Sequence, residues 1–264
     1  MANAEQRIAG IKPGLRAVVT AGAAGIGRAI ADARIAHGAR VIVSDIDEAA
    51  LGDFRAVHPD HRAVHADAGS EAGTGQLFEA VREDFGDLDL LVNNAGIAGP
   101  TAAVEDITTE AWQQTVDINL TGHFFALREA VPLLKQGRDG SIVMLSSVAG
   151  RLGFPHRLPY AATKWAVVGM AKSLAIELGS HGIRVNAVLP GIVEGPRINR
   201  VIQAEADKLG VSFDEVKERK LAATSLKRMV TADDIANTVL FLVSPMGRNV
   251  SGQALSVCGD VWSV

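Results

Sequence analysis

Short runs of apolar, often β-branched residues alternate along this chain with longer segments whose apolar residues recur with the period of an α-helix. Several of the short runs are apolar throughout, which indicates strands that are buried on both faces of a parallel sheet. The expected strands are Ala17–Thr20, Val41–Ser44, Ala63–His65, Leu88–Val92, Ser141–Leu145, Arg184–Val188 and Ala254–Val257. The expected helices lie near residues 26–37, 47–57, 71–85, 109–134, 159–179 and 231–243. The alternation predicts an α/β fold with a doubly wound parallel β-sheet.

The organisation of the chain indicates one domain over residues 1–264. A chain of 264 residues can bury a substantial core without metals or disulfides, and no linker, charge block or repeat divides it. The exception to the strand and helix alternation is the segment 191–226, where the Gly/Pro-rich stretch GIVEGPRINR leads into two charged, helix-like pieces. Because long excursions from a compact fold are often active-site lids, this segment is predicted to be a helical substrate-binding lid.

The charge balance argues against polyanionic partners. There are 30 acidic and 26 basic residues, 5% aromatic residues and no basic run, so neither nucleic acid nor a membrane is an expected partner.

The N-terminus lacks the apolar core of a signal peptide, and no stretch reaches the ~18 apolar residues of a membrane span, so a cytoplasmic location is expected. The single Cys258 excludes an intramolecular disulfide. This fits a reducing compartment, and equally an exported protein without disulfides.

A glycine-rich turn, TAGAAGIG, lies between the first expected strand and the helix that follows it. Glycines such as Gly22, Gly25 and Gly27 let backbone N–H groups approach a pyrophosphate at the positive end of the helix dipole. Asp45 ends the second strand roughly 20 residues further on, where a carboxylate can accept hydrogen bonds from a ribose. The structural alternatives are an ordinary glycine-rich turn and a helix cap that Asp45 shares with Asp47.

Three further motifs follow in a fixed order. NNAG occupies residues 93–96 after the fourth expected strand, the pair Ser146–Ser147 ends the fifth, and Y-x-x-x-K runs from Tyr160 to Lys164. Each motif is weak by itself, and the ordered set is specific. With it, residues from about 15 to 259 resemble the classical short-chain dehydrogenase/reductase family. The resemblance implies a Rossmann-type sheet of about seven strands, a nicotinamide cofactor, a small-molecule substrate and a homotetramer.

The resemblance also assigns roles to individual residues. A Ser–Tyr–Lys–Asn catalytic group falls on Ser147, Tyr160, Lys164 and Asn119, the asparagine of the sequence DINL. Ser147 is preferred over Ser146, which is expected to form local contacts, because of its spacing from the tyrosine. The implied cofactor contacts are Gly22, Gly25, Ile26, Gly27, Asp45, Asp67, Ala68, Asn94, Ala95, Gly96, Tyr160, Lys164, Pro190, Gly191 and Val193. The implied substrate contacts are Ser147, His156, Glu194 and Arg197. Asn93 is expected to stabilise the central sheet.

The chemistry of Tyr160 and Lys164 supports the assignment independently. A phenol with an ordinary pKa near ~10 is a poor base at neutral pH, so a catalytic tyrosine needs help to ionise. The two residues are four apart on a helix opened by Pro159, so their side chains share a face, and an ammonium favours the ionised phenol. Ser147 can bind the substrate oxygen, and Asn119 can hold a water or backbone group that passes protons onward. The structural alternative is an exposed helical pair.

Three departures from the family pattern bear on the cofactor and the substrate. Ala21 stands at the first glycine of the turn, and Glu194 stands where the family has a threonine that contacts the carboxamide. No Arg or Lys precedes Gly25 or directly follows Asp45 to bind a 2′-phosphate, and Arg28 is expected to face the surface or the pyrophosphate. NAD is therefore expected in preference to NADP.

The sequence leaves several readings of function open. The leading one is an NAD-dependent oxidoreductase that acts on a secondary alcohol or ketone of a sugar, polyol or hydroxy acid. The alternatives are an NADPH-dependent 3-oxoacyl thioester reductase, which Asp45 disfavours, and a non-catalytic dinucleotide sensor, which would not need the catalytic set.

Glu194 and Arg197 either lie exposed as a weak ion pair or face inward, where Arg197 binds an anionic group and Glu194 binds hydroxyls. No metal site is expected from His58, His61, His65 and Cys258.

Overall fold

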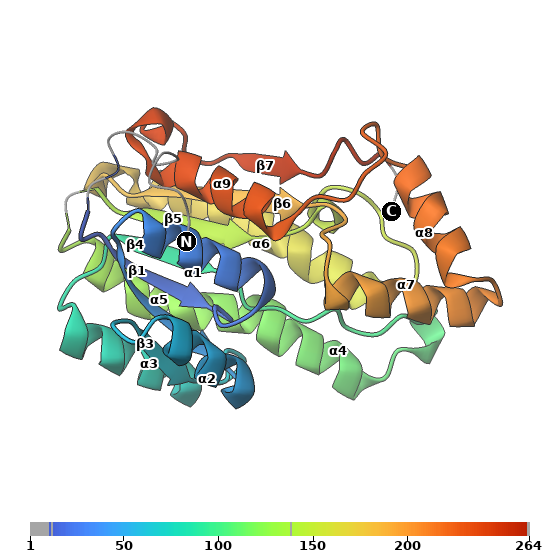
Figure 1. The fold of residues 1–264 in the computed structure, drawn as a ribbon, viewed down its shortest axis with the longest axis horizontal. Coiled ribbons are helices and arrows are strands. Elements are labelled where there is room, and N and C mark those ends of the chain that lie inside the picture. Colours follow the sequence, from blue (N-terminus) through green and yellow to red (C-terminus); the bar gives the residue numbers. More distant parts are fainter. Residues whose placement is uncertain (1–10, 12, 138, 263–264) are drawn as a thin grey trace.

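Parallel strands form the centre of the molecule. A computed structural model, which describes residues 11, 13–137 and 139–262, contains a seven-stranded sheet in the order β3-β2-β1-β4-β5-β6-β7 (Figure 1). The strands are β1 (Arg16–Thr20), β2 (Arg40–Asp45), β3 (Arg62–His65), β4 (Leu90–Asn93), β5 (Ser141–Leu145), β6 (Arg184–Pro190) and β7 (Ala254–Val257). All neighbouring strands pair in parallel. The expected fold class is thus confirmed, and the continuously apolar runs are the buried central strands.

Helices cover both faces of the sheet. They are α1 (Gly25–Ala36), α2 (Glu48–Val57), α3 (Glu71–Asp84), α4 (Thr109–Val116), α5 (Gly122–Leu134), α6 (Leu158–Leu178), α7 (Pro196–Leu209), α8 (Phe213–Ala222) and α9 (Ala232–Val243). Side chains of α1, α2 and α9 pack on one face of the sheet, and those of α3, α5 and α6 pack on the other. Within the described part of the chain, no helix combines the length and the apolar character that a membrane span requires.

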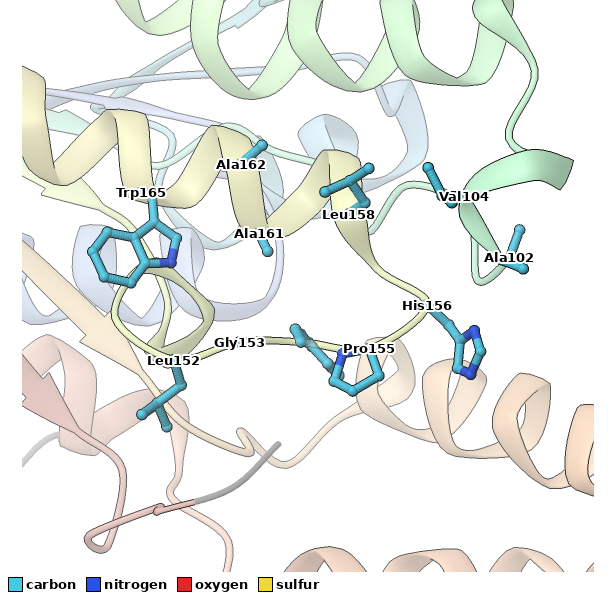
Figure 2. A pocket seen from close by; sticks show the side chains of 12 residues that line it. Ala102, Val104, Leu152, Gly153, Pro155, His156, Leu158, Ala161, Ala162 and Trp165 are labelled. Atoms are coloured by element: carbon cyan, nitrogen blue, oxygen red, sulfur yellow. The ribbon is translucent and has the colours of Figure 1, made fainter.

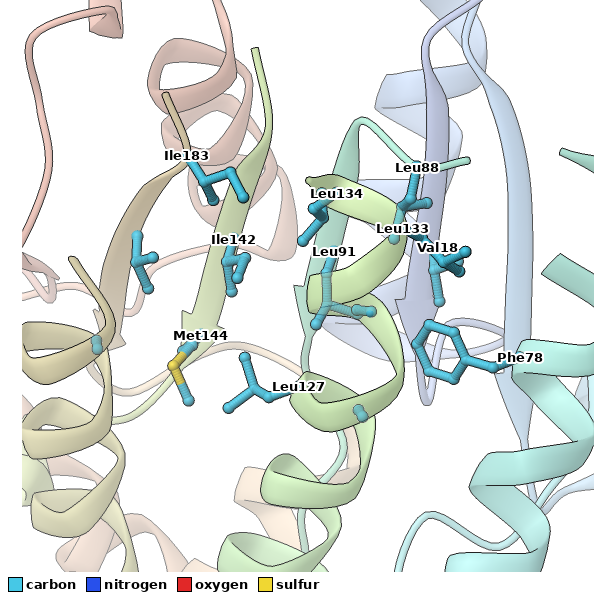
Figure 3. Close-up of a cluster of buried hydrophobic side chains, with 14 of the residues drawn as sticks. Val18, Phe78, Leu88, Leu91, Leu127, Leu133, Leu134, Ile142, Met144 and Ile183 are labelled. Carbon is cyan, nitrogen blue, oxygen red and sulfur yellow. The ribbon is translucent and has the colours of Figure 1, made fainter. Parts of the chain in front are cut away.

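The two cores follow from the two-sided burial of the strands. On the face covered by α3, α5 and α6, Phe78, Leu91 and Ile142 are fully buried (Figure 3). On the opposite face, Phe54 of α2 and Ile30 of α1 are fully buried against the β1 and β2 side chains. Each such side chain contributes about 1.5–3 kcal/mol to folding. These cores hold the carboxyl ends of the strands in fixed positions.

The strand order reverses between β1 and β4, and this reversal positions the site. From β1 the chain winds outward to β2 and β3, and then returns to place β4 on the other side of β1. In open α/β sheets the crevice at such a switch point, outside the carboxyl ends of the strands, is where ligands bind. The glycine-rich turn after β1 and the NNAG sequence after β4 therefore lie side by side.

One expected helix, near residues 109–134, consists of three pieces. Between α4 and α5 the residues Asp117–Thr121 form a π-helical turn. The apolar pattern continues through all three pieces, so the period of the sequence could not reveal the change in hydrogen bonding. π-Helical turns occur frequently at functional sites, and this one carries the buried Asn119.

The segment 191–226 contains the two expected helical pieces, α7 and α8. They pack around a small apolar cluster of their own, centred on Ile202, Ala206 and Val216. Lys220 of α8 and Glu205 of α7 form an ion pair at 2.6 Å. The segment is thus a small helical unit between β6 and α9, with a core separate from those of the sheet.

Candidate active site

The glycine-rich turn leads from β1 into the N-terminus of α1. A side chain at Gly22 would bring its Cβ within 2.7 Å of the Val19 carbonyl oxygen, so the close packing of the turn on β1 requires glycine here. Gly25 has a φ of +55° and opens α1, whose first turn has no side-chain cap. The uncapped N–H groups can therefore bind an anion such as a pyrophosphate.

Ala21 adopts a left-handed conformation, with a φ of +48°. For a residue other than glycine this costs roughly 1–2 kcal/mol. The Asn94 side chain holds the strained backbone in place, because its Nδ2 donates hydrogen bonds to the carbonyl oxygens of Thr20 and Ala21, at 3.0 and 2.9 Å. The turn thus keeps a glycine-like backbone although alanine replaces the expected glycine.

Asp45 lies at the carboxyl end of β2 and is tied to the same turn. Its Oδ2 accepts a hydrogen bond from the backbone N–H of Ala23 at 3.2 Å, and its Oδ1 accepts one from Ile46 N–H at 2.9 Å. The cap of α2 is Asp47, whose Oδ1 accepts hydrogen bonds from two N–H groups of the helix. Asp47, and not Asp45, therefore caps the helix. The position of Asp45 fits a ribose diol.

Arg28 lies in the first turn of α1 and pairs with an acidic side chain of the same helix. Its Nε pairs with Asp32 Oδ1 at 2.7 Å, and its guanidinium carbon lies 5.0 Å from the ring centroid of Phe54. Asp32 also contacts His58 Nε2 at 2.7 Å. These contacts engage Arg28 with side chains of α1 and α2. Its side chain is 20% exposed, and the expectation that it faces the surface or the pyrophosphate stays a prediction.

The NNAG sequence connects the turn to the catalytic candidates. Asn93 is fully buried and donates from Nδ2 to the His123 carbonyl oxygen at 3.0 Å, so it links β4 to α5. A Cβ on Gly96 would lie 3.3 Å from Lys164 Nζ and 3.2 Å from Asn119 Oδ1. Glycine at this position therefore leaves space beside the lysine.

Tyr160 and Lys164 lie one turn apart on α6, as the spacing predicts. Lys164 is 3% exposed, its Nζ donates to the Leu145 carbonyl oxygen at 2.8 Å, and Nζ lies 5.8 Å from the ring centroid of Tyr160. Ser146 forms the local contact expected of it, because its Oγ donates to the Lys164 carbonyl oxygen at 2.7 Å. Burial, and secondarily the charge of Arg197, lowers the pKa of Lys164 to about 7.

Ser147 and Asn119 complete the group at the ends of β5 and α4. Ser147 Oγ accepts a hydrogen bond from Ala149 N–H at 3.2 Å, which leaves its proton for a substrate oxygen. Asn119 Oδ1 accepts from Ile97 N–H at 2.7 Å, and its Nδ2 donates to Ile97 O at 3.0 Å and to Thr163 Oγ1 at 3.3 Å. The asparagine side chain thus joins the 94–98 loop to α6.

Two buried residues beside this group have no counterpart in the sequence motifs. His123 is fully buried, its Nε2 lies 3.0 Å from the Ala95 carbonyl oxygen, and burial lowers its pKa to about 3. It is therefore neutral at physiological pH. Arg157 precedes Tyr160 by one helical turn and is 4% exposed. No sequence motif identified Arg157, because an arginine just before a helix is usually solvated.

The remaining cofactor candidates lie around the same crevice. Asp67 accepts a hydrogen bond from Gly69 N–H at 2.8 Å, while Ser70 caps α3. Pro190 ends β6, and a Cβ on Gly191 would lie 2.7 Å from Cys258 Cα, so the turn after β6 packs closely on the chain after β7. Val193 forms a bridge with Val230. Ile26 lies in the first turn of α1, and Ala68 and Ala95 lie in the turns after β3 and β4.

The substrate candidates separate into two groups. Glu194 and Arg197 are exposed at the start of α7, and among the residues that the structure describes no ion pair joins them. The charge of Arg197 nevertheless lowers the pKa of both Lys164 and Arg157. His156 has a φ of +60°, and its Nδ1 lies 3.2 Å from Lys208 Nζ of α7.

A cavity of about 560 Å³ lies beside α6, and His156 is one of its lining residues. Figure 2 shows Trp165, Ala161 and Leu158 along α6, with Leu152, Pro155 and His156 on the loop that precedes the helix. Ser147, Tyr160 and Lys164 are not among the lining residues. The cavity is apolar and is distinct from the group that carries the proton chemistry.

The histidines near β3 contact other groups of the protein. His61 Nδ1 accepts a hydrogen bond from Val41 N–H at 3.2 Å, and His58 contacts Asp32. In the part of the chain that the structure describes, no three His, Cys, Asp or Glu side chains are placed to hold a metal ion together.

Comparisons with known proteins agree with this geometry. Residues 21–259 match the family model described as enoyl-(acyl carrier protein) reductase. The 3-oxoacyl-(acyl-carrier-protein) reductase FabG of Staphylococcus aureus (strain Mu50 / ATCC 700699) is 36% identical over 251 residues, which cover 93% of this chain and 97% of that protein. Galactitol 2-dehydrogenase of Agrobacterium fabrum is 36% identical over 248 residues, 93% and 96% of the two chains. The structure of NAD⁺-bound xylitol dehydrogenase gives a TM-score of 0.89 at 28% identity, with 94% and 98% coverage.

Proposed function

The chain belongs to the classical short-chain dehydrogenase/reductase family, and from this premise we propose that it is an NAD-dependent enzyme for a small polar substrate. The family consists of oxidoreductases that act on CH–OH groups. The substrate is a sugar, polyol or hydroxy acid whose secondary alcohol is interconverted with a ketone. The bound dinucleotide supplies or accepts the hydride, and the protein's own residues handle the proton and the substrate oxygen.

Four side chains perform the proton chemistry. Tyr160 is the general acid and base at the substrate oxygen, and Ser147 donates a hydrogen bond to the same oxygen. Lys164 stabilises the ionised phenol, and its lowered pKa lets it release and regain a proton near neutral pH. Asn119 fixes the 94–98 loop against α6 and so keeps the approach to Lys164 in place.

The observation that carries the choice of cofactor is the fixed carboxylate of Asp45. It faces the glycine-rich turn, where its oxygens can accept hydrogen bonds from the ribose hydroxyls of NAD. The 2′-phosphate of NADP would meet this carboxylate as a like charge. Arg28, the nearest basic residue of the turn, is engaged by Asp32. NAD is therefore the preferred cofactor.

The charges around the crevice favour a substrate with polar or anionic groups. The charge of Arg197 acts on both Lys164 and Arg157, and the charged groups of these two residues lie within 6 Å of the Tyr160 ring centroid, at 5.8 and 5.2 Å. When segment 191–226 closes as a lid, Arg197 binds an anionic group of the substrate and Glu194 accepts hydrogen bonds from hydroxyls. Two similar proteins are named for polyol substrates, galactitol and xylitol.

A second candidate is a 3-oxoacyl thioester reductase. The description of the family model and the name of the S. aureus relative both favour it. Asp45 disfavours the NADPH that this alternative uses, and the cations beside Tyr160 would gain little from an apolar acyl chain. A non-catalytic dinucleotide sensor is disfavoured as well, because binding alone does not require Ser147, Tyr160 and Lys164 together.

Steady-state kinetics with both cofactors tests this proposal. Polyols, hydroxy acids and a 3-oxoacyl thioester are each assayed with NAD(H) and NADP(H), and we expect the highest kcat/KM for a polar substrate with NAD. The variant Asp45→Ser/Ile46→Arg should move the preference toward NADP, because it replaces a like charge with a cation. Equal or better kcat/KM with NADP in the wild type would contradict the choice of cofactor. Thioester reduction as the best activity would select the second candidate.

A further inference from the structure

Arg157 is a buried cation that forms no ion pair with a carboxylate among residues 11, 13–137 and 139–262. It is the N-cap residue of α6, its Nη2 donates to the Ala98 carbonyl oxygen at 2.6 Å, and its Nε has no hydrogen-bond partner among the described residues. Glu205, the carboxylate whose charge acts on it, pairs with Lys220 at 2.6 Å. Because burying a guanidinium costs several kcal/mol, such a residue calls for a compensating interaction.

The guanidinium lies over two aromatic rings. Its central carbon is 5.2 Å from the ring centroid of Tyr160 and 5.2 Å from that of Phe154, and the two rings meet edge to face at 6.4 Å. A cation over a neutral ring gains about 0.5–2 kcal/mol. An ionised phenol in the same place would attract it more strongly, because the phenolate carries a full charge. Arg157 is therefore placed to interact most strongly with Tyr160 in its ionised form.

The electrostatics of the surroundings agree with this placement. Burial lowers the pKa of Arg157, and the charge of Tyr160 is the largest influence that raises it. Three charged groups act on the pair itself: Lys164 on α6, and Arg197 and Glu205 on α7. The titratable groups next to these and to Phe154 are Lys220 on α8, which lies over Phe154, Lys208 on α7, which contacts His156 of the preceding loop, and His123 on α5, which is near Lys164. Most of these groups are cationic, so an ionised Tyr160 would supply negative charge that balances them.

We propose that Arg157 is a positioning residue that acts with Lys164 to stabilise the ionised side chain of Tyr160. The proposal rests on the proposed role of Tyr160 as general acid and base. Lys164 acts from the same helix one turn onward, and Arg157 acts from one turn before. The Ala98 carbonyl fixes the guanidinium, so the charge is in place before the phenol ionises and need not reorganise.

The sequence provides a direct readout, because Tyr160 is the only tyrosine among the 264 residues. The near-ultraviolet absorbance of tyrosinate therefore reports this side chain alone, without substrate or turnover. The pH titration is recorded for the wild type, Arg157→Met, Arg157→Gln and Arg157→Lys. Gln retains a donor for Ala98 and removes the charge, and Lys retains the charge.

We expect the Tyr160 midpoint to rise by about one pH unit or more in Arg157→Met and Arg157→Gln, the size typical of one lost opposite charge. Arg157→Lys should recover at least half of the shift. Arg151→Met is the matched control, since Arg151 is an exposed arginine of the same loop that bonds Ser256, and its midpoint should stay at the wild-type value. The pH profile of kcat should move in parallel with the titration.

Two results would overturn the proposal: an unchanged midpoint in Arg157→Gln, or equal shifts in the Gln and Lys variants, which would indicate packing rather than charge. If Arg157→Met does not fold, the comparison of Gln with Lys still decides. Lys164→Met separates this inference from the proposed function. A Tyr160 that titrates near its ordinary value and does not respond to Lys164→Met contradicts the acid and base role itself. A response to Lys164 without one to Arg157 contradicts only the inference.

Discussion

The charge of Lys164 is buried, so the stability of the folded protein depends on pH through this group. Burial lowers the pKa of Lys164 from 10.5 to about 7, whereas the unfolded chain keeps the proton up to about pH 10.5. Between these values the unfolded state binds more protons, so the contribution of this group to stability rises with pH. Below pH 7 the folded protein bears the full cost of the buried ammonium.

Lys164→Met should therefore abolish activity and stabilise the fold at low pH. The cost of the charge is at most roughly 5 kcal/mol, at about 1.36 kcal/mol per pKa unit, and losing the bond to Leu145 offsets about 1 kcal/mol. We expect the free energy of unfolding at pH 6, from urea titrations, to rise by at least about 1 kcal/mol, with a smaller gain at pH 9. Lys135→Met, at an exposed lysine, is the control and should change little. A gain that is equal at both pH values would contradict the buried-charge account.

At the scale of single residues, the spacing of the motifs predicted which side chains lie together, but the sequence did not predict how deeply a side chain is buried. The i,i+4 spacing predicted that Tyr160 and Lys164 share a face of α6, and the structure confirms it. The spacing carried no information on Arg157, because an arginine before a helix is usually solvated. Its burial depends on Ala98 and Phe154, and only the folded loops bring those residues together.

At the scale of elements, the strands were predictable and the break in the 109–134 helix was not. Short apolar, often β-branched runs identified all seven strands, with ends that agree or differ by at most two residues. α-Helical and π-helical turns bury similar faces, so periodicity cannot separate them over five residues. The turn at Asp117–Thr121 is a property of the hydrogen bonding, and it carries Asn119, whose side chain pairs with Ile97.

The variant Arg197→Ala tests whether α7 contributes to the recognition of substrate. With Arg197→Ala, we expect kcat/KM for a hydroxy-acid substrate to fall tenfold or more, because a paired guanidinium and carboxylate form two charge-assisted hydrogen bonds. The loss for the corresponding uncharged polyol should be much smaller. Arg200→Ala is the matched control, since Arg200 is an exposed arginine three residues further along the same helix.

The comparison between the two substrates decides the role of Arg197. Equal losses for the acid and the polyol would show that the variant disturbs α7 or the cofactor rather than an anion contact. No loss for either would return Arg197 to a surface role and leave Glu194 as the remaining candidate on this segment.

At the scale of the whole molecule, α6 has an apolar side that the single chain does not cover. Trp165 is 52% exposed and Ile176 is 86% exposed. Ala162, one turn before Trp165, and Gly169, one turn after it, are also exposed on this side of the helix. A Cβ on Gly169 would meet nothing within 4 Å. The apolar cavity of Figure 2 adjoins the Trp165 end of this stripe. Large exposed apolar surfaces on a protein of this kind mark association sites.

We therefore expect the homotetramer that the family resemblance implies to use the exposed side of α6 as one interface. Trp165→Glu would place a charge in the contact, where an unpaired buried carboxylate costs several kcal/mol, and the mass measured by light scattering should fall from about four chains to two or one. Val57→Glu, which changes an apolar residue with 62% exposure at the end of α2, is the matched control and should keep the wild-type mass. A Trp165→Glu protein with unchanged mass, or a wild type that is already monomeric, would contradict the assignment of this helix face.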